Sequence, residues 1–256
     1  MKLLTIGNPK TIKGEKLGYL TAILHLAPHK LSGYNVCPMA TAGCAAACLN
    51  TAGRGGMFAG EKTADLTGSE MVTQINSGRL VNRIQSARIT RTKMVAENRK
   101  EFMAQLVKEL RSFFKMAERN ELTPVIRLNG TSDLRWEIYK VTVDGVEYDN
   151  VMSLFPNIQF YDYTKIPNRR NLPANYHLTF SLAEDNDIFA LGAIENGMNV
   201  AVVFRTADYP KTFMGLTVVD GDESDLRFLD PSRSIVGLKA KGKAKKDNSG
   251  FVREVA

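Results

Sequence analysis

The three cysteines of this 256-residue chain are the residues whose type and spacing most clearly indicate chemistry. Cys37, Cys44 and Cys48 follow the spacing C-x6-C-x3-C and lie within twelve residues of one another. Cys44 and Cys48 are four apart, so on a helix they would share a face, and the preceding loop can return Cys37 to the same place. Three thiolates are the protein ligands of a [4Fe–4S] cluster with one open iron, or three of the four ligands of a zinc ion.

Other interpretations of the cysteines stay open at this point. A zinc site needs a fourth ligand, such as His25 or His29, but Pro28 breaks the helix that would align the two histidines. Three small buried hydrophobic side chains are the interpretation without a metal. The spacing alone does not choose between iron and zinc. We predict Cys37, Cys44 and Cys48 as metal ligands, with a [4Fe–4S] cluster and a zinc ion as the two candidate groups.

The cysteines lie in residues 31–60, called the cysteine segment below. Its first 23 residues, Leu31 to Gly53, carry no charge and are long enough to cross a bilayer. Pro38, three glycines and the cysteines exclude a membrane helix, so no membrane partner is expected. The N-terminus lacks the apolar core of a secretory signal. An odd number of cysteines without such a signal predicts a reducing cytoplasm.

The net charge of +7 is concentrated in two stretches. Residues 79–100 hold seven basic residues against Glu97, and residues 239–256 hold six basic residues against two acidic ones. Such stretches are typical of nucleic-acid contacts, or of a solvated helix face and a flexible tail. No aromatic residue for base stacking lies between Ile75 and Glu101. The candidate phosphate contacts on helical spacings are Arg79, Arg83, Arg88 and Arg91.

The elements that must position these residues follow two patterns. Residues 63–120 are predicted to be mainly helical, because apolar residues from Val95 to Ala117 recur at helical steps. From residue 123, expected strands (125–128, 158–163, 176–182, 200–204 and 234–238) alternate with short helices (151–155 and 185–195). The alternation predicts a parallel sheet. The helical residues with this spacing are Val95, Phe102, Leu106, Leu110, Phe113 and Ala117.

No glycine-rich phosphate loop follows the first strand, so a doubly wound sheet is less expected than a barrel. The predicted fold class is α/β, a full or partial (β/α) barrel with an N-terminal cysteine-containing loop and helix segment. One α/β domain would span residues 1–238, with β/α repeats over 123–238. Residues 239–256 would form a basic, flexible tail.

Polar side chains follow four successive predicted strands, where ligand residues collect in parallel barrels. A mouth lined by Asp133, Lys165, Glu184 and Arg205 is one hypothesis. Turn and helix-capping roles explain Asn129, Ser132 and Asp133 equally well, and carboxylates such as Glu184 are common at helix N-termini. The predicted cofactor-binding residues are Asn129, Ser132, Asp133, Lys165, Glu184 and Arg205.

Several stretches resemble a known family over nearly the whole chain. They are residues 19–28, 35–38, 42–44, 48–56, 88–92, 126–133, 160–165 and 237–244. They resemble bacteriophage and prophage proteins related to the gene-product-eighty-eight-like phage family. More distantly, the layout is similar to radical S-adenosylmethionine enzymes, whose three cluster cysteines precede a (β/α) barrel but usually follow the spacing C-x3-C-x2-C. This second resemblance implies a [4Fe–4S] cluster and makes S-adenosylmethionine a further candidate cofactor.

The sequence therefore predicts a phage-encoded iron–sulfur protein in the host cytoplasm. Its open iron would face the strand ends and bind an unidentified small molecule, with redox or radical S-adenosylmethionine-like chemistry. The alternative is a non-catalytic nucleic-acid-binding protein with a structural metal. Walker, G-x-S-x-G and H-E-x-x-H motifs are absent, and the sequence indicates no catalytic residue.

Overall fold

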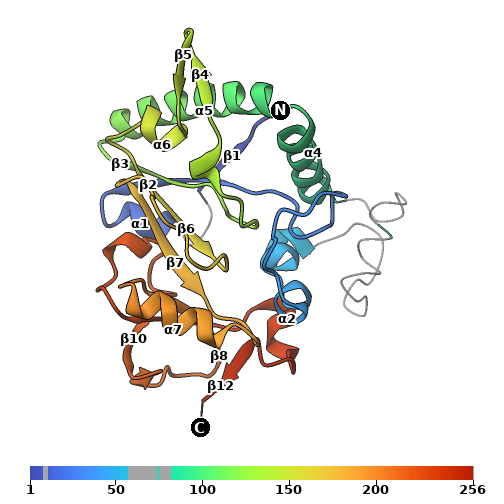
Figure 1. Cartoon of the computed structure of the whole chain (residues 1–256), viewed down its shortest axis with the longest axis vertical. Helices are drawn as coiled ribbons and strands as arrows, with labels where there is room; N and C mark the ends of the chain where they lie inside the picture. Colours follow the sequence, from blue (N-terminus) through green and yellow to red (C-terminus); the bar gives the residue numbers. More distant parts are fainter. Residues whose placement is uncertain (8–10, 57–73, 75–81, 256) are drawn as a thin grey trace.

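The computed structural model describes residues 1–7, 11–56, 74 and 82–255 and has a mixed α/β architecture (Figure 1). A ten-stranded, mostly parallel sheet has the order β1-β2-β3-β6-β7-β8-β11-β10-β9, and β12 pairs with β8 off this path. The large parallel sheet confirms that part of the predicted fold class. The strands of this sheet are β1 Leu4–Ile6, β2 Tyr19–Leu24, β3 Thr123–Arg127, β6 Gln159–Thr164, β7 Tyr176–Ser181, β8 Val200–Arg205, β9 Thr212–Phe213, β10 Leu216–Asp220, β11 Ile235–Lys239 and β12 Val252–Glu254.

The described helices are few, and the longest lie near the N-terminal half of the sheet. A separate hairpin pairs β4 (Val141–Val143) with β5 (Val146–Tyr148). The α-helices are α1 Thr11–Glu15, α2 Ala42–Ala46, α4 Arg83–Glu97, α5 Arg99–Arg119, α6 Val151–Leu154 and α7 Asp187–Glu195. The 3-10 helices are η1 Leu49–Thr51, η2 Gly53–Gly56, η4 Trp136–Ile138, η5 Arg227–Leu229 and η6 Gly242–Lys246.

Helix α5 supplies much of the core because its apolar residues share one face. The six residues predicted from the helical spacing are all buried, five of them on α5 and Val95 on α4. They join the apolar face of β2 and β3, including Leu24 and Ile126, in one hydrophobic cluster. Burial of each Val, Leu, Ile or Phe side chain among them stabilises the fold by about 1.5–3 kcal/mol. The helical spacing from Val95 to Ala117 therefore predicted α4 and α5 correctly, whereas residues 63–73 and 75–81 of the predicted helical stretch lie outside the described residues.

The described strands do not form a closed barrel, so of the predicted full or partial barrel the full version is not seen. The sheet begins at β1, antiparallel to β2, and ends at β9, antiparallel to β10. The face of the sheet opposite α5 is covered by η5, where the Phe228 ring lies 5.5 Å from the rings of both Tyr19 and Tyr161. In a closed barrel this face of the sheet would be covered by side chains from the strands on the opposite side of the barrel. Here η5 covers it instead.

The expected flexible tail is also corrected, because residues 239–254 pack into the fold. Strand β12 runs parallel to the end of β8, with Val252 opposite Val203 and Glu254 opposite Arg205. Along β8, strand β7 pairs only with the first two residues, Val200 and Ala201. Strand β12 pairs with the later residues of β8, which β7 does not reach. Ala240, Ala244 and Val252 form a small apolar cluster with Ala47 of the cysteine segment.

No described helix is long and apolar enough to cross a membrane. The cysteine segment, of which residues 31–56 are described, lies beside the end of the sheet toward which β7 points (Figure 1).

Candidate functional site

The cysteine segment holds its sulfur atoms through short local structures. Cys44 lies in α2, which begins where the Thr41 hydroxyl accepts a hydrogen bond from the Cys44 backbone N–H at 3.1 Å. The Cys48 sulfur accepts a hydrogen bond from the Asn50 N–H at 3.5 Å at the start of η1. The Cys37 sulfur accepts one from the His29 N–H at 3.3 Å. All three cysteines are half-buried free thiols.

The three thiols come together in space. Burial raises the pKa of Cys37 to about 12, and the nearby Cys48, Asp133 and Cys44 raise it further. Burial likewise raises the pKa of Cys48 to about 11, with a further contribution from Cys44. Charges influence one another in this way only over short distances. The three thiols therefore lie within electrostatic range of one another.

The described part of the chain contains no group of three or more His, Cys, Asp or Glu side chains close enough to hold a single metal ion. The three thiols thus lie near one another, but their sulfur atoms are too far apart to bind one metal ion together. At neutral pH both Cys37 and Cys48 are protonated in the metal-free protein, so binding a metal would release protons.

Three of the four predicted mouth residues reach the cysteine segment. The Glu184 carboxylate accepts hydrogen bonds of 2.6 Å from both the Thr41 hydroxyl and the Gly43 N–H. Lys165 contributes a positive charge that favours the Cys48 thiolate, and Asp133 contributes a negative charge near Cys37. A Cβ atom at Gly43 would lie 2.8 Å from Glu184 Oε1, so glycine allows this close approach.

The remaining strand-end residues have other partners. Arg205 donates to the Asp247 carbonyl and forms a 3.2 Å ion pair with Glu254, which ties β8 to the last strand. Asn129 is buried and accepts from Ser132 Oγ at 2.9 Å and from Trp136 Nε1 at 3.0 Å. The turn role left open for Asn129 and Ser132 is therefore the one seen in the structure, and Arg205 does not line the predicted mouth.

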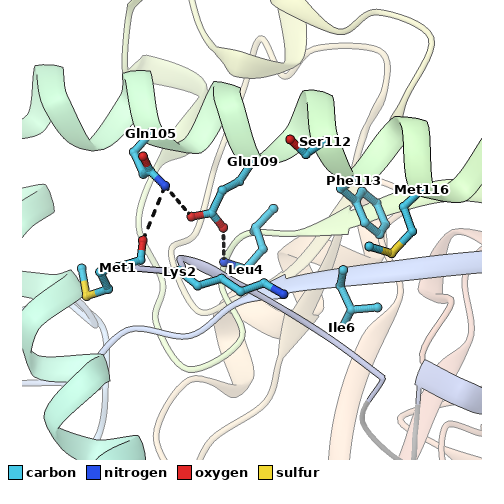
Figure 2. A pocket seen from close by; sticks show the side chains of 9 residues that line it. All are labelled: Met1, Lys2, Leu4, Ile6, Gln105, Glu109, Ser112, Phe113 and Met116. Atoms are coloured by element: carbon cyan, nitrogen blue, oxygen red, sulfur yellow. Dashed lines mark hydrogen bonds between the residues drawn. The ribbon is translucent and has the colours of Figure 1, made fainter.

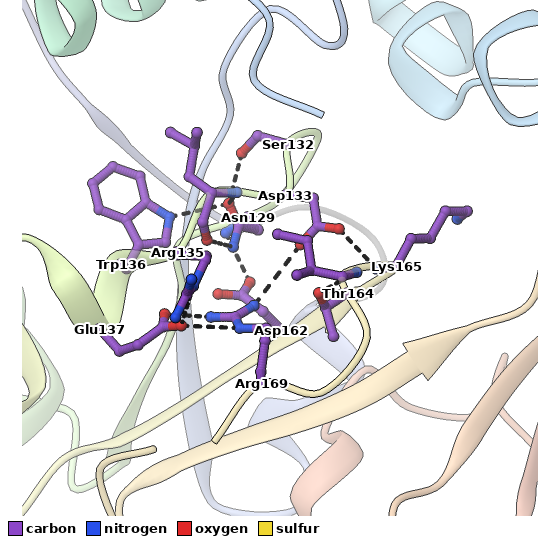
Figure 3. Close-up of polar contacts among 12 residues, drawn as sticks. Asn129, Ser132, Asp133, Arg135, Trp136, Glu137, Asp162, Thr164, Lys165 and Arg169 are labelled. Carbon is purple, nitrogen blue, oxygen red and sulfur yellow. Dashed lines mark hydrogen bonds and ion pairs between the residues drawn. The ribbon is translucent and has the colours of Figure 1, made fainter. Parts of the chain in front are cut away.

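Beside Asp133 lies a polar cluster that the sequence prediction missed, here called the Arg169 network. It contains Asn129, Asp133, Glu137, Asp162 and Arg169 (Figure 3), together with Tyr176, whose hydroxyl donates to Asp162. Arg169 forms ion pairs with Glu137 and, at 3.8 Å, with Asp133. Asp162 accepts from the Asn129 N–H at 2.7 Å and from the Tyr176 hydroxyl at 2.9 Å. Burial raises the pKa of Asp162 to about 7. No periodic pattern in the sequence marks Arg169, because it lies in a loop.

Comparison with known proteins adds one finding. A protein-family model described as gene product 88 matches residues 1–255. The chain belongs to the gene product 88 family. This confirms the resemblance to a phage-protein family, whereas no match supports the resemblance to radical S-adenosylmethionine enzymes. No curated protein and no solved structure matches the chain.

In this gene product 88 family member, helix α4 directs two of its arginines inward. Arg88 Nη1 donates to the Asn50 carbonyl at 3.0 Å and to the Asn50 side chain. Arg91 Nε donates to the Lys2 carbonyl at 2.9 Å. Arg88 and Arg91, two of the candidate phosphate contacts, therefore already bind backbone carbonyls of the chain itself. Arg83 is exposed, and Arg79 lies outside the described residues.

A pocket of about 350 Å³ lies between β1 and α5, away from the cysteines (Figure 2). It is lined by Leu4, Ile6, Phe113 and Met116 among others, and Glu109 accepts the Leu3 and Leu4 N–H groups beside it. Its lining includes none of the predicted site residues. The candidate site therefore remains the cysteine segment with Asp133, Lys165 and Glu184.

Proposed function

We propose that this phage-family protein binds a [4Fe–4S] cluster through Cys37, Cys44 and Cys48, leaving one iron open to another ligand. The observation that carries the proposal is the convergence of the chain's three cysteines beside charged side chains that follow parallel strands. Such strand ends are where α/β proteins place ligands. The family match names no chemistry, so the proposal rests on this site.

The residues present fit a cluster in donor type and in spacing. A single zinc ion needs ligands about 2.0–2.3 Å from one centre, whereas a cluster places its own irons and sulfides between the thiolates and spans a wider gap. Ala45 and Ala46, between Cys44 and Cys48, have small side chains, whereas Ser249 and Glu184 already fill the space at Gly43. Backbone N–H groups of His29 and Asn50 already point at sulfur atoms. Hydrogen bonds of that kind adjust the reduction potential of iron–sulfur clusters.

The cluster, when bound, would supply one-electron chemistry and an open coordination position. The chain's own residues would hold and orient it. Glu184 fixes the start of α2 through Thr41 and Gly43. Arg88 and Lys165 favour the thiolate form of Cys48 by their positive charge. We propose redox chemistry as the reaction class. Radical S-adenosylmethionine-like chemistry is the more specific version, for which the C-x6-C-x3-C spacing gives no support.

Anaerobic reconstitution with iron and sulfide tests the proposal. We expect about four iron and four sulfide per chain, and an EPR signal from the cluster after reduction. A parallel sample reconstituted with zinc controls for unspecific thiol binding. Stoichiometric zinc with no iron under competition between the two metals would sink the iron–sulfur proposal.

One observation favours nucleic-acid binding as a second candidate. The basic 3-10 helix η6 packs beside η1 of the cysteine segment, and Lys241, Lys245 and Lys246 around it are exposed. Phosphate contacts of this kind release counterions, so the affinity for DNA or RNA would fall steeply with salt. Filter binding at rising salt concentrations tests this candidate. Affinity that is absent, or unchanged when the three lysines become glutamine, contradicts it.

A further inference from the structure

Helix α7 carries apolar side chains on both of its faces. On one face, Ala190 and Ile194 are buried in the apolar cluster that α7 forms with β7 and β8 (Figure 1). On the opposite face, Ile188 is 74% exposed and Leu191 is 48% exposed, and Phe189 at the side of the helix is 39% exposed. A helix that is apolar on all sides is normally buried on all sides. The bare face of α7 is therefore a candidate contact surface.

Gly192 lies beside Ile188 on this bare face, because residues four apart share a face of a helix. A Cβ atom added at Gly192 would meet no other atom within 4 Å. No contact among the described residues therefore requires a glycine there, although glycine in a helix interior is less favourable than alanine. A glycine at such a position lets another chain approach the helix backbone closely. Gly192 is thus a second observation, independent of the exposed side chains, that indicates a partner.

The charges around α7 indicate the kind of partner. Residues 183–199 contain four acidic residues and no basic one, although the whole chain carries a net charge of +7. Asp187 pairs with Arg253 at 3.0 Å. Asp185, just before the helix, and Glu195, its last residue, are exposed and form no ion pair with the described residues. A partner with an apolar stripe between basic side chains would complement this surface.

Two other occupants fit the charges less well. In a symmetric dimer α7 would pack against its own copy, so acidic ends would meet acidic ends whichever way the two helices ran. A membrane surface that carries anionic lipids would repel Asp185 and Glu195. The charges therefore favour a separate protein that presents a basic helix.

We propose that the outward face of α7, formed by Ile188, Leu191 and Gly192, binds an amphipathic basic helix of a partner protein. The apolar side chains of that helix would cover Ile188 and Leu191, and one of its turns would approach the backbone at Gly192. Its Lys or Arg side chains would face Asp185 and Glu195. The inference goes beyond the proposed function and does not depend on a bound cluster.

A synthetic helical peptide serves as the probe, with leucines along one face and lysines on both flanks. The fluorescein-labelled peptide is titrated with the full-length chain, and fluorescence anisotropy is the readout. The matched peptide has glutamate in place of every lysine. We expect saturable binding of the lysine peptide that weakens as salt rises. The glutamate peptide should bind at least about tenfold more weakly.

Variants of α7 locate the binding surface. Ile188→Gln and Leu191→Gln should each weaken binding of the lysine peptide at least about tenfold. The matched control is Ile138→Gln, which removes an isoleucine that is 56% exposed on η4 and should bind like the wild type. Gly192→Ala should raise the midpoint of urea unfolding and lower the affinity for the peptide. A purely structural role of Gly192 would not move the two measurements in opposite directions.

Four outcomes would overturn the inference. They are no binding of the lysine peptide, equal affinity for the two peptides, wild-type affinity in both Ile188→Gln and Leu191→Gln, and tighter binding to phosphatidylserine vesicles than to the peptide. Analytical ultracentrifugation adds a fifth. A dimer of the wild type that Leu191→Gln dissociates would assign this face to a second copy of the chain instead.

Discussion

The Arg169 network and the cysteine segment lie at the same edge of the sheet and treat their polar groups differently. In the Arg169 network, arginine meets carboxylate and each buried carboxylate accepts a backbone or side-chain donor. In the cysteine segment, two of the three thiols have strongly raised pKa values. Both regions contain buried polar atoms without a hydrogen-bond partner, namely Arg88 Nε beside the cysteine segment and Asp133 Oδ1 and Arg169 Nη1 in the network. Polar groups that satisfy one another stabilise a fold.

The largest expected effect is on iron content, which should fall when the cysteine segment is changed and stay the same when the Arg169 network is changed. Cys48→Ser should lose nearly all the iron that the reconstituted wild type retains, because two thiolates cannot hold the cluster as three do. Ser132→Ala, in the turn beside the Arg169 network, is the matched control and should retain wild-type iron. Iron and sulfide assays on both variants make the measurement. Equal iron in Cys48→Ser and wild type would contradict the role of the cysteines.

The second prediction concerns stability. Arg169→Met leaves the buried Glu137 carboxylate without its main partner, and breaking a buried pair in this way costs about 3–5 kcal/mol. Urea unfolding should show this loss, while Lys140→Gln, which breaks the exposed pair with Glu147, should leave the curve unchanged. A midpoint in Arg169→Met equal to that of the wild type would show that the network contributes no stability.

The third prediction is a pH dependence from Asp162. Burial raises the folded-state pKa to about 7, from 3.8. The folded protein therefore keeps a proton that the unfolded chain has lost. This contribution to stability is complete below pH 3.8 and is lost as pH rises to about 7, at about 1.4 kcal/mol per pH unit. Unfolding free energies of wild type should fall relative to Asp162→Asn over that range. Parallel curves for the two proteins would contradict the raised pKa.

The smallest expected effect concerns the contacts between β8 and the C-terminal residues. Arg205→Gln removes a half-exposed ion pair with Glu254 and a hydrogen bond to the Asp247 carbonyl. Partly exposed pairs contribute little, so the loss should be about 1 kcal/mol or less by urea unfolding. Iron content should stay at the wild-type value. A loss of iron in Arg205→Gln would return this residue to the predicted mouth.

Much of the framework could be predicted from local patterns. The helical spacing from Val95 to Ala117 placed α5 and its buried face, and the apolar runs placed β3, β6, β7, β8 and β11, because periodicity and burial act within one element. Strands such as β1 and β12 were not predicted. They are three residues long and exist only through pairing with a neighbour.

The candidate site could be predicted only in part. The cysteines were evident from their spacing, and Asp133, Lys165 and Glu184 from following apolar strands. The inward direction of Arg88 could not be predicted, because helical spacing shows which residues share a face of the helix but not which part of the chain packs against that face. Asn129 and Arg205 follow apolar strands just as Lys165 does. In the structure, however, Asn129 bonds to Trp136 in the following loop, and Arg205 pairs with Glu254 of the last strand.

The sequence by itself determined that the thiol groups are few and close together, that a parallel sheet follows, and that the basic charge lies in two stretches. Tertiary structure decided which groups meet. It turned Arg88 and Arg91 inward to carbonyl groups, paired the C-terminal strand with β8, and brought Arg169 to Glu137 and Asp133. The physical reason is that such contacts join residues far apart in the chain, so the partner of each polar group depends on packing rather than on its neighbours in sequence.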